Sequence, residues 1–154
     1  MIHIEDTLRP EHVLLGLKAT DPESATKALM EKLRGDERVL DWAAFHEAVR
    51  KHPPCRVWDA APFGICIPHA RTEAVSGMVL TAARLAVDTP FPECDKPVRY
   101  VFCMGVPQEM ASDYLRIAGL LMRIFTDKAT EEVLHTAKSG EVFLSALENL
   151  EVKI

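Results

Sequence analysis

The stretch GICIPHAR, Gly64 to Arg71, is a short strand-like segment that runs into a proline with a histidine directly behind it. Proline has a fixed φ and no N–H, so we expect the hydrogen-bond ladder of the strand to stop at Pro68. His69 would then stand at the carboxyl edge of a sheet, where the ligand sites of open α/β sheets collect, with Arg71 near the same spot. A neutral imidazole serves as a nucleophile or a base, and a guanidinium holds an oxyanion. The alternative is a histidine that only caps the strand end and bonds locally.

Two further segments of strand-like composition follow, at residues 78–87 and 98–106. In the second of them, alternate residues from Val98 onward are apolar, and so are most of the residues between them. A strand that is apolar on both faces usually lies inside a sheet that helices cover on both sides. We therefore expect residues 64–67, 78–87 and 98–106 to be strands of one covered sheet.

Apolar residues at helical spacing predict two helices before these strands and three after them. The first begins at Asp21, an N-cap residue followed by a proline, and stops near Gly35. The second carries an apolar stripe that starts at Trp42, and it ends before Pro53, where a loop to residue 63 begins. The later helices are expected at 112–125, 130–138 and 141–150, with these residues turned inward: Leu115, Ala118, Leu121, Met122, Val142, Phe143, Ala146, Leu147 and Leu150.

This order of elements predicts an α/β fold in which a mixed β-sheet is sandwiched between helices. The 154 residues are expected to form a single domain, residues 1–154, and 48% of them are apolar, which suffices for a sizeable core. The net charge of −5 disfavours nucleic-acid binding, which needs a basic surface. No apolar run approaches the ~18 residues of a membrane span, and the first residues carry charges early, unlike a secretory signal. We expect a cytoplasmic protein with no membrane insertion.

The four cysteines, at positions 55, 66, 94 and 103, form no CxxC pair. We expect all four to be free thiols, with disulfides or a metal site as the alternatives. Cys66 and His69 are three residues apart, but no second pair completes a zinc set. The chain also lacks a Walker loop, a GxGxxG turn, a GxSxG elbow and an HExxH helix. We therefore expect no metal and no cofactor.

The hexapeptide GICIPH, residues 64–69, resembles the G-I-A-I-P-H signature of the enzyme IIA domains of the fructose/mannitol class. These domains belong to the bacterial phosphoenolpyruvate-dependent phosphotransferase system, and the nitrogen-regulatory enzyme IIA proteins share the signature. The resemblance extends over most of the chain. Thr89-Pro90-Phe91, Lys96-Pro97-Val98 and residues 100–107 resemble the family's "P-I-x-F…P-V-x-L-x-F-x-L-x-x-P" stretch. SDYLRIAGLLMRIF (112–125) and SGEVFLSALE (139–148) resemble its last helices.

The resemblance implies a mixed sheet with helices on both sides and a phosphoryl relay without metal or nucleotide. By position, His69 is the histidine that accepts a phosphoryl group from the histidine-containing phosphocarrier protein. Transport members of the family pass the group to a IIB domain, and regulatory members control a target protein. Arg71, backbone N–H groups and a hydroxyl are the expected donors to the phosphoryl oxygens.

Two departures from the family pattern stand out. The family's "S-T-G-I-G-x-G" loop is replaced by VWDAAPFG, residues 57–64. In it, Trp58, Pro62 and Phe63 are expected to crowd the site and Asp59 to repel a phosphate. The family's second histidine is replaced by Tyr114, which donates one hydrogen bond but cannot become a cation. A half-buried aromatic without a site role is the alternative for Tyr114. The remaining histidines are expected to face solvent: His3, His12, His46, His52 and His135.

The first functional hypothesis is a phosphohistidine carrier that uses His69, Arg71 and Tyr114 as its catalytic residues. A regulatory role is expected because no IIB or IIC segment is joined to the chain, and sugar uptake is the other role. The alternative is a degenerate enzyme IIA-like binding or sensor module that does not relay phosphate. A third hypothesis is an unrelated hydrolase with His69 as its base, although no paired nucleophile or carboxylate motif accompanies it.

Overall fold

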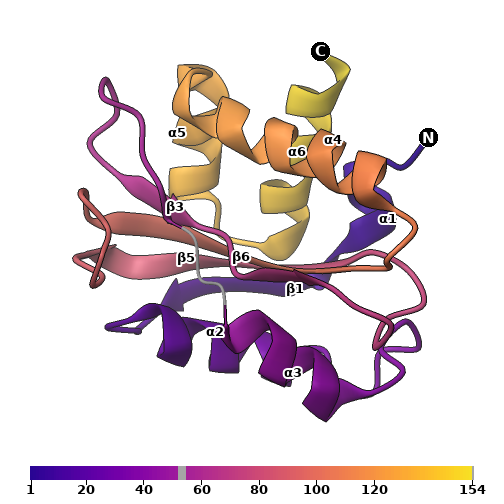
Figure 1. The fold of residues 1–154 in the computed structure, drawn as a ribbon. Helices are drawn as coiled ribbons and strands as arrows, with labels where there is room; N and C mark the ends of the chain where they lie inside the picture. The colour runs from indigo at the N-terminus through magenta and orange to yellow at the C-terminus, as the bar shows by residue number, and fades with distance from the viewer. Residues whose placement is uncertain (52–54, 154) are drawn as a thin grey trace.

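A mixed β-sheet forms the middle layer of the computed structural model, which describes residues 1–51 and 55–153 (Figure 1). Its strands are β1 (Leu8–Leu17), β2 (Cys55–Arg56), β3 (Gly64–Cys66), β4 (His69–Arg71), β5 (Val79–Thr89) and β6 (Val98–Val106). The order across the sheet is β1-β5-β6-β3-β2, and β4 also pairs with β6. β5 and β6 are antiparallel, as are β2 and β3, whereas the pairs β1–β5, β3–β6 and β4–β6 are parallel.

Helices cover both faces of this sheet (Figure 1). They are α1 (Ile4–Thr7), α2 (Pro22–Glu31), α3 (Trp42–Arg50), α4 (Ala111–Met122), η1 (Arg123–Phe125), α5 (Lys128–Thr136) and α6 (Gly140–Val152). α2 and α3 lie on one face, and α4, α5 and α6 on the other. The sheet sandwiched between helices confirms the expected fold class. Within the described ranges, no helix combines the length and the apolar character that crossing a membrane requires.

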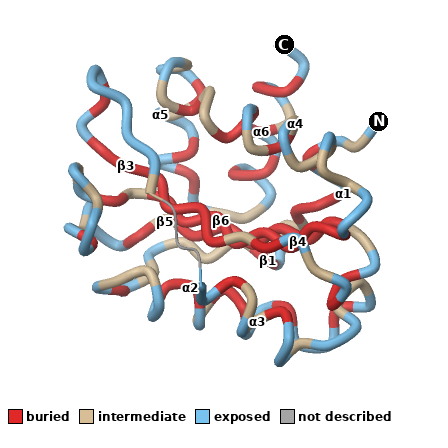
Figure 2. The backbone as a smooth tube through the Cα atoms, in the orientation of Figure 1, coloured by how far each residue is buried: buried red, intermediate tan, exposed pale blue. Residues whose placement is uncertain are grey.

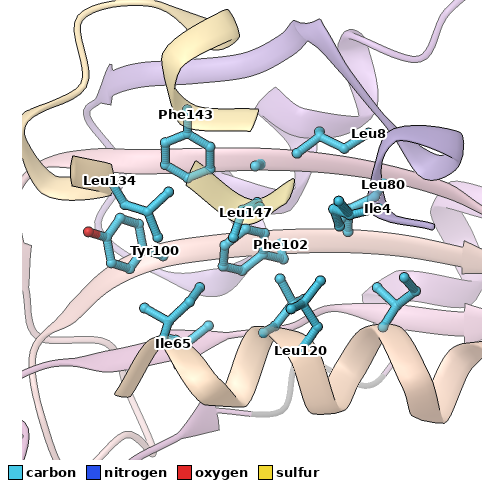
Figure 3. Close-up of a cluster of buried hydrophobic side chains, with 14 of the residues drawn as sticks. Ile4, Leu8, Ile65, Leu80, Tyr100, Phe102, Leu120, Leu134, Phe143 and Leu147 are labelled. Atoms are coloured by element: carbon cyan, nitrogen blue, oxygen red, sulfur yellow. The ribbon is translucent and has the colours of Figure 1, made fainter. Parts of the chain in front are cut away.

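β6 is the central strand and divides the core into two clusters. Tyr100 and Phe102 point to the α4–α6 side and pack with Phe143 and Leu147 (Figure 3). Val101 and Cys103 point to the α2–α3 side. In Figure 2 the buried residues accordingly concentrate along the sheet, with further buried residues on the helices that cover it. A strand that is apolar on both faces thus lies where its sequence predicts.

Side-chain caps fix where several helices begin. The Asp21 carboxylate accepts a hydrogen bond from Ser24 N at 2.8 Å, with proline in the first turn, as the sequence predicts. Asp41 accepts from Ala44 N at 3.0 Å at the start of α3, and Ser139 accepts from Val142 N at 3.2 Å at the start of α6. Short polar residues at these positions therefore set the ends of the helices that cover the sheet.

The edge strand β1 was not predicted from the sequence. It is half-buried and contains Pro10 and the charged residues Arg9 and Glu11, which weaken the alternation of a strand. Proline is tolerated there because an edge strand leaves one row of N–H groups unpaired. The register between β1 and β5 also shifts between Leu8 and Val13, as expected of a strand with an irregular interior.

Two residues expected to face inward are exposed. Leu115 is 67% exposed, and the buried residues of α4 are Ile117, Leu120 and Leu121. Val142 is 46% exposed, whereas its neighbour Phe143 is fully buried. In α4 and in α6, apolar residues at spacings of three and four form more than one possible stripe along the helix. The position of the sheet determines which of these stripes is buried.

The expectation of four free thiols is wrong for two of them. Cys55 and Cys94 form a disulfide with a Cα–Cα distance of 5.7 Å. Cys66 and Cys103 are free and buried, and burial raises the pKa of both thiols to about 12. The disulfide joins residues 39 apart, a pairing that the sequence spacing could not show.

The expectation of solvent-facing histidines is also wrong for His12, which is only 7% exposed on β1. Desolvation lowers the pKa of its imidazole. His46 is half-buried against Trp42, with ring centroids 5.1 Å apart. His3 and His135 are exposed as expected, and His52 lies outside the described residues.

A buried ion pair ties the segment after α2 to the start of β5. The Asp36 carboxylate, 1% exposed, accepts hydrogen bonds from Arg38 and from Arg9. Arg38 Nη1 also donates to the carbonyls of Thr7 at 3.1 Å and Met78 at 3.2 Å. The Arg38 side chain holds the pKa of Asp36 down to about 2.

Candidate functional site

His69 lies where the chain leaves β3 and resumes as β4. β3 ends at Cys66, and His69 begins the second line of pairing, opposite Met104 of β6. The carbonyl of Pro68 accepts a hydrogen bond from Met104 N at 2.9 Å, so β6 holds both sides of the break. Pro68 interrupts the strand as predicted, and the imidazole is half-buried at the edge rather than in the core.

The imidazole is fixed by a backbone carbonyl. Its Nδ1 lies 2.8 Å from the carbonyl oxygen of Ile67. A carbonyl oxygen only accepts hydrogen bonds, so Nδ1 carries the hydrogen. In the neutral ring, the lone pair is therefore on Nε2. Because Nδ1 is hydrogen-bonded to the backbone two residues earlier, the ring is held in one orientation and Nε2 points in a defined direction.

Tyr114 on α4 faces that free nitrogen. The Tyr114 hydroxyl lies 3.2 Å from His69 Nε2, and the two rings stack with centroids 4.9 Å apart and planes at 27°. Because Nε2 of the neutral ring is an acceptor, the hydroxyl is the donor. The structure therefore brings together His69 and Tyr114, although they are 45 positions apart in the chain.

An open cavity of about 410 Å³ lies in front of these rings. It is lined by His69, Ala70, Arg71, Ala111, Tyr114 and Leu115. Arg71 is exposed, and within the described part of the chain its guanidinium has no carboxylate partner within ion-pair distance. An unpaired guanidinium beside an imidazole lone pair is suited to an anionic group. The three predicted site residues thus line one cavity.

The N-terminus of α4 opens onto the same cavity. Ala111 is the first residue of α4, and no side chain caps this end of the helix. The first N–H groups of a helix are unsatisfied and carry a partial positive charge, which favours a nearby anion. Asp113 in the first turn offsets part of this effect.

The loop that replaces the family's glycine-rich segment lies away from His69, so the expected crowding of the site is wrong. Lys96, just before β6, donates to the carbonyls of Asp59 at 2.9 Å and of Trp58. β3 begins at Gly64 opposite Val98, whereas His69 pairs with Met104, six residues farther along β6. Gly64 and His69 are five residues apart, so at about 3.3 Å per residue the start of β3 lies up to roughly 16 Å from His69.

Phe63, also expected to crowd the site, is buried elsewhere. Its ring stacks on Phe125 with centroids 5.3 Å apart and meets Tyr100 edge-on. Asp59 likewise does not line the cavity in front of His69. The departure from the family's loop therefore leaves the space before the imidazole open.

Sequence reasoning missed two features of the site. The Ile67 carbonyl is a backbone group, and nothing in its side chain marks it as the partner of His69. Leu115 was assigned to the core but forms the rim of the cavity. The stripe Ile117, Leu120, Leu121 and Ile124 has the same spacing of three and four, so spacing alone could not have shown that Leu115 faces outward.

Comparisons with known proteins agree with this architecture. The family described as "Phosphoenolpyruvate-dependent sugar phosphotransferase system, EIIA 2" matches residues 6–150. A "PTS system fructose-specific EIIA component" from Haloferax volcanii is 36% identical over 86 residues, which are 55% of this chain and 56% of that protein. The aligned region thus spans only about half the length of this relative.

Solved structures show the same fold. The nitrogen regulatory protein IIA-Ntr from Neisseria meningitidis superimposes with a TM-score of 0.77 at 22% identity, covering 94% of this chain and 98% of that one. The structure of enzyme IIAMTL with phosphorylated enzyme IIBMTL from Escherichia coli gives 0.69 at 20% identity, with 93% and 98% covered. The match over residues 6–150, together with the shared fold, shows that the chain belongs to the EIIA 2 family of the phosphoenolpyruvate-dependent sugar phosphotransferase system.

Proposed function

We propose that His69 is a phosphoryl acceptor and that the phosphoryl group binds to Nε2. The observation that carries this proposal is the hydrogen bond from Nδ1–H to the Ile67 carbonyl, which leaves the lone pair on Nε2. A neutral imidazole with its lone pair at an open cavity attacks phosphorus without first losing a proton. The donor is the phosphohistidine of the histidine-containing phosphocarrier protein, whose N–P bond breaks as the new one forms.

Arg71, Tyr114 and the end of α4 have defined roles in this transfer. As the lone pair of Nε2 attacks phosphorus, the Tyr114 hydroxyl turns from Nε2 to a phosphoryl oxygen, which lies within reach because the two groups are 3.2 Å apart. Arg71 provides the positive charge that the three equatorial oxygens need. Ala111, the first residue of α4, lines the same cavity, and the N–H groups at this end of the helix add weaker donors. Positioning and electrostatics suffice, because the donor already has high transfer potential.

The product keeps the same anchoring. Nδ1–H stays bonded to Ile67 after transfer, so the phosphoryl group remains directed at the opening of the cavity. We propose that a IIB domain or a regulated target protein then takes the group, in sugar uptake or in regulation, and that the protein acts in the cytoplasm. The neighbour solved with phosphorylated enzyme IIBMTL supports an acceptor of the first kind.

A binding or sensor module that does not relay phosphate is the second candidate. It is favoured by Tyr114, a neutral residue where the family's second histidine would supply a cation. Such a module would still use the cavity before His69 for a partner, but His69 would stay unmodified.

One experiment separates the two candidates. The protein is incubated with phosphoenolpyruvate, enzyme I and the phosphocarrier protein, and its intact mass is measured beside a known family member. We expect one added phosphoryl group, labile in acid and stable in base, because protonation of the imidazole makes it a better leaving group. His69→Ala should gain none, while His135→Ala, which removes an exposed histidine on α5, should behave as wild type. If the wild type stays unmodified while the known member is phosphorylated, the relay proposal is refuted.

A further inference from the structure

The disulfide between Cys55 and Cys94 lies at the surface, at the edge of the sheet beside β2. Cys55 is the first residue of β2, and Cys94 lies in the loop between β5 and β6. Both residues are partly exposed, whereas Cys66 and Cys103 are buried. A thiol in solution can therefore reach the sulfur atoms of the disulfide, whereas it cannot reach the buried thiols of Cys66 and Cys103.

The edge strand β2 has few other attachments within the described residues. Its pairing with β3 consists of Cys55 opposite Cys66 and Arg56 opposite Ile65. The segment after it is held by Lys96, which donates to the Asp59 carbonyl at 2.9 Å. Lys96 is two residues from Cys94, so the disulfide and this lysine fasten the same two segments to each other.

The disulfide also packs against the strand that leads to His69. A Cβ at Gly64, the first residue of β3, would lie 3.0 Å from Cys94 Sγ and 3.4 Å from Cys55 Sγ. Glycine therefore lets the two sulfurs rest close to the backbone of β3. Three residues farther along, the Ile67 carbonyl holds the His69 ring. The disulfide thus holds β2 against β3, the strand that leads to the imidazole of His69.

We propose that Cys55 and Cys94 are a reversible dithiol–disulfide site for small thiols and that the bond acts as a clamp of β2 on β3. In reduction, a small-molecule thiolate attacks one sulfur and forms a mixed disulfide with that cysteine, while the protein S–S bond breaks and the other cysteine leaves as a thiolate that takes up a proton. A second small thiolate then displaces the remaining cysteine and leaves as part of an oxidised small disulfide. Exchange with that oxidised small disulfide runs the same steps backwards and restores the clamp.

The first measurement is the state of the thiols. The full-length protein is incubated in millimolar reduced glutathione, alkylated with iodoacetamide and weighed intact, and the modified residues are mapped by peptide analysis. We expect two alkyl groups, on Cys55 and Cys94, and none on the buried Cys66 and Cys103. Oxidised glutathione should restore the unmodifiable form. A disulfide that persists in millimolar reduced glutathione would be a permanent crosslink, and the proposal would be wrong.

The second measurement is amide hydrogen exchange of the reduced and oxidised protein. Reduction should speed exchange in β2 and at Gly64–Cys66 at least about tenfold, because it raises the population of the open edge strand. The melting temperature should fall on the order of 10 °C, since a bond across 39 residues no longer constrains the unfolded chain.

In reduced or in oxidised glutathione, the Cys55→Ser, Cys94→Ser double variant should have the hydrogen exchange and melting temperature of the reduced wild type. Cys103→Ala, which keeps the disulfide, should respond to reduction as the wild type does. Unchanged exchange at β3 after reduction would refute the clamp even if the disulfide is reducible. None of these measurements uses the phosphocarrier protein, so their outcome is independent of whether His69 accepts a phosphoryl group.

Discussion

Replacing Tyr114 with phenylalanine removes one hydroxyl and keeps the ring that stacks on His69. The lost hydrogen bond is neutral and 3.2 Å long, longer than the usual 2.7–2.8 Å of an O–H donor, so it is worth about 1 kcal/mol. In the resting protein the same hydroxyl bonds to the attacking lone pair, and this bond must break before transfer. The two effects oppose each other. We expect Tyr114→Phe to slow phosphoryl acceptance about 2- to 10-fold, well below the ~10²-fold loss of a well-aligned oxyanion donor.

The assay is rapid quench after mixing with excess phosphorylated phosphocarrier protein, with the fraction modified read by intact mass. Tyr114→His is the matched variant, because it restores the residue type that the family resemblance places there, and it should equal or exceed the wild-type rate. Tyr114→Leu removes the stacked ring as well and should be slower than Tyr114→Phe. If Tyr114→Phe is at least as fast as wild type, the hydroxyl does not reach the phosphoryl oxygens and its assigned role is refuted.

Three further outcomes follow from the structure. Arg71→Ala should slow acceptance about 10- to 100-fold, the loss of one charged hydrogen bond, without lowering the melting temperature, because Arg71 is exposed; a rate within twofold of wild type would exclude it from the site. The pKa of Asp36 is lowered to about 2 from 3.8, so its ion pair with Arg38 should contribute about 2 kcal/mol to the free energy of unfolding above pH 5. In urea titrations of the wild type, most of that contribution should be lost as the pH falls from 5 to 2, and Asp36→Asn should not show this loss. Parallel pH dependences of the two proteins would contradict it. Tyr100→Phe should lower the melting temperature by about 2–4 °C, because the hydroxyl of a fully buried ring no longer donates to Glu131; no change in thermal scans would show that this bond is not stabilising.

The layers of the fold could be predicted from sequence because its central strand is apolar on both faces, a pattern typical of a sheet covered by helices on both sides. β6 is buried on both faces, and its composition shows this without reference to any other segment. The start of α2 could be predicted because Asp21 and Pro22 are local signals. β1 could not, because Arg9, Pro10 and Glu11 interrupt its pattern and its burial comes from α6 and β5, far away in the chain.

The site was predictable in part for a related physical reason. Pro68 breaks a strand through its own covalent structure, so the position of His69 at an edge follows from neighbouring residues. The approach of Tyr114 depends on how α4 packs on the sheet, and only the family resemblance indicated it. The outward rotation of Leu115 and the pairing of Cys55 with Cys94 depend on tertiary packing alone. The same holds for the distance between the loop at Trp58 and the imidazole, which sequence proximity suggested to be short.

The claim that Nε2 of His69 carries the phosphoryl group is tested most directly by nuclear magnetic resonance of the phosphorylated protein. Labelling histidine with ¹⁵N and observing ³¹P–¹⁵N coupling identifies which ring nitrogen is bonded to phosphorus. We predict coupling to Nε2 of His69 alone, with Nδ1 still protonated and hydrogen-bonded to the Ile67 carbonyl. Coupling to Nδ1 would contradict it, because that nitrogen is occupied by the backbone in the structure, and so would a phosphoryl group on any other residue.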